Sequence, residues 1–178
     1  MESRATKHLA SKTPLGNYAP FTDLLISSGH DPASVSNYRR QLDSRTGLGT
    51  VSYSIGEANY TREFFCSHPN DVVAVRYTST TPTLNLTVKT STKHEGAKVK
   101  SSIGDNGNRI VLNGEAKMIQ DNNRFMQIVD VSSSDGSVAA GSDGAIEVAN
   151  ASHDHPGRLL RLRSGLSVVQ RTRFQIRL

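Results

Sequence analysis

Tryptophan is absent from this chain of 178 residues, and cysteine occurs once. A single cysteine excludes an internal disulfide, and because Cys66 lies in an apolar, strand-like pattern we expect a buried, unreactive thiol. No run reaches the roughly 18 apolar residues that a membrane-spanning helix needs, so we expect no membrane partner. A long helical period is also missing up to residue 151, which argues against a helical fold.

Several functional signatures are missing as well. The sequence contains no phosphate-binding loop, dinucleotide fingerprint or nucleophile elbow. The glycine-rich stretch 136–144 does not lead from a strand into a helix, so we interpret it as a turn region. Aromatic residues make up only 6% of the chain, which argues against a dedicated sugar-binding platform because sugars stack on aromatic rings.

The net charge of +5 is concentrated at one end of the chain. Residues 1–151 contain equal numbers of basic and acidic residues, 15 of each, whereas residues 152–178 contain six arginines and only Asp154. The charge therefore describes a tail and not a binding face, and we expect no nucleic-acid partner.

Three interpretations of the tail at 152–178 remain open. It could be a basic arm, a pair of edge strands, or sequence that did not evolve as part of this domain. Suitable codons for residues 152–161, read one base later, can encode an apolar strand, so a frameshift or misplaced intron would explain the composition.

Alternating patterns predict most of the remaining structure. Val51, Tyr53 and Ile55 share one face of a half-buried strand, and residues 60–65 alternate in the same way to complete a hairpin. Asn113-Gly114 predicts a second tight hairpin turn, and residues 92–108 and 132–144 read as loops and turns. Further strands are predicted at 24–26, 72–78, 84–89, 110–112, 125–130 and 145–149.

The spacing of these strands, near 10 residues with turns between them, predicts an all-β fold of antiparallel sheets, a sandwich or a barrel. We divide the chain into a disordered leader at 1–13, a β-sandwich domain at 14–151 and the basic tail at 152–178.

An ordered series of segments resembles a known family. The segments are Leu15-Gly16-Asn17-Tyr18-Ala19-Pro20-Phe21-Thr22-Asp23-Leu24, Tyr38-Arg39-Arg40-Gln41-Leu42-Asp43, Gly49-Thr50-Val51-Ser52-Tyr53, Tyr60-Thr61-Arg62-Glu63-Phe64-Phe65, Ser67-His68-Pro69 and Val72-Val73-Ala74-Val75-Arg76-Tyr77. In this order they resemble the N-terminal domain of glycoside hydrolase family 95, the inverting α-L-fucosidases and their relatives. The resemblance is strongest over residues 14–90 and looser over 91–151.

The resemblance implies a large β-sandwich that precedes and packs against a catalytic (α/α)₆ barrel. The catalytic acid and base reside in that barrel, so we predict no catalytic, cofactor-binding or metal-binding residue here, no cofactor, and no activity of this chain alone. Two departures stand out: Thr22 occupies a position where glycine is common, and residues 1–13 lack the secretory lead that is frequent in the family.

Four local patterns have both a functional and a structural interpretation. Tyr38, Arg39, Arg40 and Asp43 could grip a carboxylate and stack on a sugar, but we favour pairing of either arginine with Asp43 or Glu63 to fix a loop. Arg62 and Glu63 point to opposite faces of one strand, so each is expected to pair across strands. His153-Asp154-His155 resembles a metal-ligand cluster, but no third ligand follows at a helical or strand spacing, so we expect no metal site there. His68 before Pro69 is expected in a turn.

Two classes of function follow. The chain is a non-catalytic scaffold domain of a fucosidase-type enzyme, whose partner is the catalytic barrel, or it is a free-standing β-sandwich module that binds a glycan or a protein. A third possibility is a pseudogene-like product with no function, which would expose an apolar interface and unpaired sheet edges.

Overall fold

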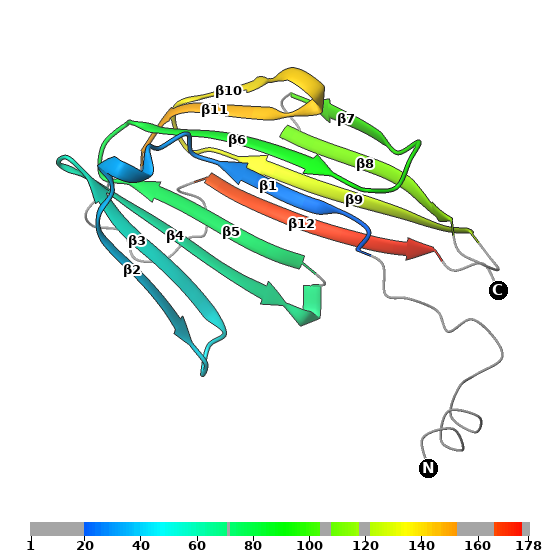
Figure 1. The fold of residues 1–178 in the computed structure, drawn as a ribbon, viewed down its shortest axis with the longest axis horizontal. Coiled ribbons are helices and arrows are strands. Elements are labelled where there is room, and N and C mark those ends of the chain that lie inside the picture. Colours follow the sequence, from blue (N-terminus) through cyan, green and yellow to red (C-terminus); the bar gives the residue numbers. More distant parts are fainter. Residues whose placement is uncertain (1–19, 71, 104–107, 118–121, 153–165, 176–178) are drawn as a thin grey trace, which may run out of the picture.

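The computed structural model describes residues 20–70, 72–103, 108–117, 122–152 and 166–175, the last of these as backbone only. These residues form twelve β-strands and three short 3₁₀ turns, with no α-helix and hence no helix that could cross a membrane among them. All strand pairs are antiparallel, and the strands form one sheet of four and one of eight (Figure 1). The predicted antiparallel β-sandwich is thereby confirmed.

The four-stranded sheet has the order β1 (Asp23–Ser27), β6 (Leu84–Ser91), β11 (Ile146–Ala151) and β10 (Ser137–Ala140). The eight-stranded sheet has the order β2 (Ser36–Asp43), β3 (Leu48–Ile55), β4 (Ala58–Ser67), β5 (Val72–Ser79), β12 (Leu166–Gln175), β9 (Asn122–Ser132), β8 (Asn108–Lys117) and β7 (Lys98–Ser102).

The core lies where the small sheet covers the large one. Period-two alternation places Leu84, Leu86 and Val88 of β6 on one face, and all three are buried. They belong to one apolar cluster with Ile110 of β8 and Val129 of β9, which come from the facing sheet. Each such side chain contributes about 1.5–3 kcal/mol when fully buried, so this contact between the sheets carries much of the stability.

Strand β12 joins the two halves of the large sheet. Its backbone pairs with β5 on one side and with β9 on the other. Residues 166–175 of the basic tail therefore lie in the middle of the sheet and not at its edge, whereas residues 153–165 and 176–178 lie outside the described residues. The interpretation of the tail as frame-shifted sequence, the leader at 1–13 and the domain boundaries stay predictions.

The hairpin of β3 and β4 forms as predicted. Val51, Tyr53 and Ile55 pair with Arg62, Tyr60 and Ala58, and Gly56 adopts a positive φ of 57° in the turn.

Three loop predictions were wrong. Asn113-Gly114 does not form a turn: β8 continues through it, paired with β9 as far as Lys117. The Phe125 ring of β9 occupies the space beside Gly114 where a side chain would lie. The glycine is thus needed for packing and not for chain reversal. Strands β7 and β10 also form inside segments predicted as loops, since pairing with β8 and β11 satisfies their backbones.

Candidate functional site

A pocket of about 200 Å³ lies at the junction of the two sheets. Its wall on the small-sheet side is formed by Ile26 of β1 and by Ser28 just after that strand. The large sheet supplies the other lining residues, Tyr38, Val51, Tyr53, Arg62 and Tyr77. These come from four adjacent strands, β2 to β5, so the sheet register and not the local sequence assembles the pocket.

An aromatic cluster supports one side of this pocket. Tyr53 and Tyr60 are directly paired across β3 and β4, and their rings stack with centroids 5.2 Å apart. His30 packs edge-on against Tyr60 at 4.5 Å, and a hydrogen bond of 2.9 Å joins His30 Nδ1 to the Tyr53 hydroxyl. Burial lowers the pKa of His30 and raises the pKa of Tyr53, because desolvation disfavours the charged form of each group.

Arg62 is the charged residue of the pocket. It is paired with Tyr77 across β4 and β5, and its guanidinium carbon lies 5.9 Å from the Tyr77 ring centroid, within range of a cation–π contact. In the described part of the chain no carboxylate forms an ion pair with Arg62. A half-buried guanidinium without a counter-ion has donors that can bind a carboxylate or phosphate.

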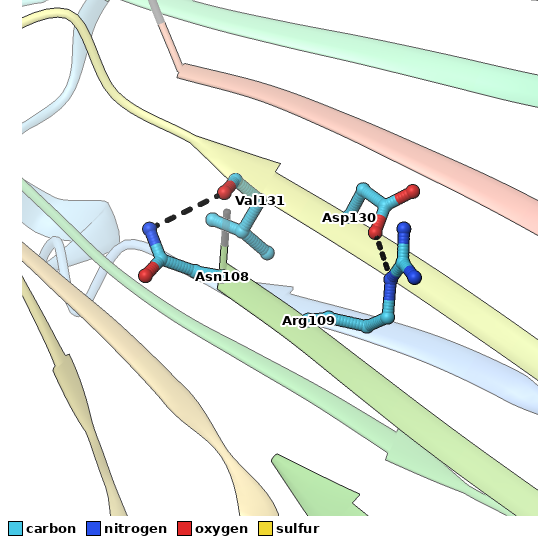
Figure 2. Close-up of polar contacts among 4 residues, drawn as sticks. All are labelled: Asn108, Arg109, Asp130 and Val131. Carbon is cyan, nitrogen blue, oxygen red and sulfur yellow. Dashed lines mark hydrogen bonds and ion pairs between the residues drawn. The ribbon is translucent and has the colours of Figure 1, made fainter. Parts of the chain in front are cut away.

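The neighbouring Glu63 behaves as the sequence predicts. It points to the opposite face and pairs across the strands with Arg76, whose Nε lies 3.3 Å from Glu63 Oε2. The same outer face carries the pair of Arg109 and Asp130 at 2.5 Å on β8 and β9 (Figure 2). The hydrogen bond to Asp130, and next the charge of that carboxylate, raise the pKa of Arg109. Asn108 donates to the Val131 carbonyl of the paired strand at 3.4 Å, so both contacts join β8 to β9 (Figure 2).

The cluster of Tyr38, Arg39, Arg40 and Asp43 is divided by the structure. A register shift between Ser36 and Arg39 places Tyr38 in the pocket, and Arg40 shares that face because it pairs with Val51. Arg39 lies on the other face.

Asp43 accepts a hydrogen bond from the backbone N–H of Arg45 at 2.9 Å, which lowers the pKa of Asp43 and closes the turn after β2. The favoured pairing of Arg39 or Arg40 with Asp43 or Glu63 is therefore not formed among the described residues.

The remaining candidates have local roles or lie outside the described residues. Cys66, expected to be buried, is exposed because the small sheet does not extend over the end of β4. His68 begins a 3₁₀ turn as predicted. His153-Asp154-His155 lies outside the described residues, and the described part of the chain contains no group of three metal-ligating side chains that could hold an ion.

Sequence reasoning missed the role of His30, Tyr53, Tyr60 and Tyr77. The one available signal was the predicted hairpin. Pairing across its turn puts Tyr53 opposite Tyr60, and Arg62 lies two residues beyond Tyr60, so all three share one face. The contribution of His30 had no comparable signal because it comes from the segment after β1.

Comparison with known proteins gives the family context. The family described as "Glycosyl hydrolase family 65, N-terminal domain" matches residues 2–155. Alpha-L-fucosidase 2 of Arabidopsis thaliana is 32% identical over 95 residues, covering 53% of this chain and 11% of that protein. Probable alpha-fucosidase A of Aspergillus oryzae is 39% identical over 74 residues, covering 41% and 10%. The protein of the same name from Aspergillus niger is 28% identical over 100 residues, covering 56% and 12%.

The aligned part of this chain thus spans about a tenth of the length of these curated relatives. The expected link to α-fucosidases is confirmed by their names, and the matched family is an N-terminal, not a catalytic, domain. The chain belongs to the family of glycosyl hydrolase family 65 N-terminal domains.

Proposed function

We propose that this chain is the non-catalytic N-terminal domain of an α-L-fucosidase of the glycoside hydrolase family 95 type, and that it packs against a catalytic (α/α)₆ barrel. The observation that carries the proposal is the match of this β-sandwich to about a tenth of each of three proteins named as α-fucosidases. The longer protein would hydrolyse terminal α-L-fucosyl residues with inversion and without a metal or organic cofactor.

The carboxylates of the described residues support a scaffold role. Inverting glycosidases need two carboxyl groups about 6.5–9.5 Å apart on either side of the sugar. Here Asp31 accepts from the Ala33 N–H and Asp135 from Ser152, while Glu63 and Asp130 are engaged by arginines. No Asp or Glu is among the lining residues of the pocket. Each of these four acids thus has a partner within the described structure, as expected for carboxylates with a structural role.

A domain exchange tests this proposal. The region of Arabidopsis alpha-L-fucosidase 2 that matches this chain would be replaced by the matching residues of this chain. Hydrolysis of an aryl α-L-fucoside by the exchanged enzyme would then be measured. We expect the 178-residue chain alone to release no fucose and the exchanged enzyme to fold and to retain activity. Fucose release by the isolated chain would contradict the proposal, and so would an exchanged enzyme that folds but is inactive.

One observation favours the alternative of a sugar-binding module. Three tyrosines, Tyr38, Tyr53 and Tyr77, line a pocket of about 200 Å³, and tyrosine rings can stack on a single sugar residue. Calorimetric titration with L-fucose tests it. Saturable binding that is lost in Tyr53→Ala but kept in Phe65→Ala, a change on the opposite face of the large sheet, would favour this second function.

A further inference from the structure

The two sheets of the sandwich differ in extent, and β2 and the end of β4 in the large sheet are left exposed. The small sheet has four strands and the large sheet eight. The shared core takes Ile110, Val129 and Val131 from β8 and β9, and Ala58, Tyr60 and Tyr77 from β4 and β5. In Figure 1, β2, β3 and β4 fan out beyond β1, with no strand of the small sheet drawn across most of their length. We call the pocket-lining side of these three strands the β2–β4 face.

Large apolar side chains are exposed on the β2–β4 face. Leu42 pairs with Gly49, and Gly49 pairs with Phe64. These three residues therefore lie on the same side of the sheet as Val51 and Arg62. Leu42 is 69% exposed, Tyr38 57% and Phe64 40%. Exposed apolar groups gathered on one face mark an interaction surface, whereas single ones need no explanation.

The free edge of β1 borders this face. Strand β1 pairs with β6 on one side, and within the described ranges nothing pairs with its other side. Its sequence, Asp-Leu-Leu-Ile-Ser, has no proline or lysine of the kind that blocks pairing at sheet edges. Neighbouring strands lie about 4.8 Å apart and packed sheets about 10 Å apart, so a strand added to β1 would lie over the pocket.

The charge of the β2–β4 face has one sign. Arg40 and Arg62 both pair with Val51, from β2 and from β4, and therefore flank it on the same side of the sheet. The two acidic residues of these strands, Asp43 and Glu63, point to the other side and have partners there. A group that covers this face would leave two arginines unpaired unless it brings a carboxylate.

We infer that the β2–β4 face and the free edge of β1 together bind an extended polypeptide segment that adds a strand to the small sheet. Alternate side chains of this segment are apolar and contact Tyr38 and Phe64, and at least one is an Asp or Glu that pairs with Arg62. Backbone pairing to an edge strand supplies affinity, and the side chains that meet the face supply specificity. The inference rests on the proposed function, because the relatives contain about ten times the length aligned here, from which such a segment can come.

Two other occupants fit the surface less well. A second copy of this chain joined by a two-fold axis would bring the same face against itself and set arginine against arginine. A sugar would fill the pocket but would leave Leu42 and Phe64 exposed and the edge of β1 unpaired.

Peptide binding tests the inference. Twelve-residue fluorescent peptides that tile the part of Arabidopsis alpha-L-fucosidase 2 outside its match would be titrated against the 178-residue chain by anisotropy. We expect binding by a peptide with alternating apolar residues and an acidic one, weakened about tenfold by Arg62→Gln, since a hydrogen bond to a charged group is lost. The matched control is Arg76→Gln, an arginine on the adjacent strand that faces the other side.

Two further readouts distinguish this binding from mere charge attraction. Two peptides would be made, one N-methylated at every odd-numbered amide and one at every even-numbered amide. Only one of the two should fail to bind, because only one edge of the added strand pairs with β1. Changing the acidic residue of the peptide to lysine should restore binding to Arg62→Glu. Circular dichroism and thermal melting would establish that each variant is folded.

The inference is overturned if no peptide binds, if both arginine variants weaken binding equally, or if sedimentation shows a dimer that Arg62→Gln tightens. L-Fucose that displaces the peptide at a concentration saturating the pocket would overturn it in favour of a sugar site. None of these readouts depends on hydrolysis. If the exchanged enzyme is active but no peptide binds, only the inference about the β2–β4 face is contradicted. If a peptide binds but the 178-residue chain itself releases fucose, only the proposed function is contradicted.

Discussion

The buried amide of Gln127 provides a direct test of the packing between the sheets. The side chain is 0% exposed, and neither its Oε1 nor its Nε2 has a hydrogen-bond partner among the described residues. It lies on the inward face of β9, opposite Leu112 of β8 and between Phe125 and Val129. Within the described part of the chain, this amide is shielded from water without a hydrogen-bond partner. We therefore predict that Gln127→Met stabilises the fold.

The magnitude follows from the desolvation penalty. A buried polar group without a partner costs about 1–3 kcal/mol, and methionine has a similar length with an adaptable, apolar side chain. We expect the free energy of unfolding to rise by about 1–3 kcal/mol. For a chain of this size each kcal/mol corresponds to about 2–4 °C in the melting temperature.

Urea denaturation followed by circular dichroism measures this change, and an unaltered m-value would show that the same surface is exposed on unfolding. The control is Gln41→Met on β2, where the side chain is exposed and the expected change stays within about 0.5 kcal/mol. A loss of stability in Gln127→Met would refute the reasoning, because it would mean that the amide has a partner in solution.

Three further predictions concern the core, the aromatic cluster and the outer face. Leu86→Ala should destabilise the fold by about 2–5 kcal/mol in denaturant titration, whereas Leu25→Ala, at an exposed position, should change it by less than about 0.5 kcal/mol; equal losses would contradict the proposed placement of the core. Since burial lowers the pKa of His30 in the folded state, the unfolded chain binds more protons, and stability should fall as the pH drops from 6.5 towards the folded-state pKa. Melting curves across that range should show less of this dependence in His30→Gln, and an unchanged slope would refute the assignment. A double-mutant cycle on Arg76 and Glu63 should give a coupling of only about 0.2–1 kcal/mol, because both side chains are substantially exposed; a coupling well above that range would show that the pair is shielded from water.

Much of the fold could be predicted from local patterns. Alternation identified β3, β4 and β6, because a strand with one buried face needs apolar residues at every second position. Turn chemistry placed Asp135-Gly136 correctly, where Gly136 has a φ of 73° that other residues rarely adopt. Asn113-Gly114 shows the limit of this reasoning. The dipeptide favours a turn on its own, but the Phe125 ring, which comes from the next strand, makes the glycine a packing position in the middle of β8.

The candidate site was harder to predict because it depends on which strands become neighbours. Tyr38 and Arg40 were recognised as a local cluster with Arg39 and Asp43, but strand pairing separates that cluster and joins Tyr38 to Tyr77 of β5 instead. The exposure of Cys66 has the same origin. Its surroundings in the sequence are apolar, and only the limited width of the small sheet leaves the end of β4 uncovered.

The sequence by itself determined the fold class, the positions of most strands and the location of the charge excess in residues 152–178, since alternation, turn residues and composition act over a few residues. Tertiary structure alone decided the order of strands in each sheet and the central position of β12. It also decided the place of Arg62 in the pocket, without an ion pair among the described residues, and the exposure of the β2–β4 face. These features depend on the register between strands and on the relative width of two sheets, and such contacts join residues that are far apart in the sequence.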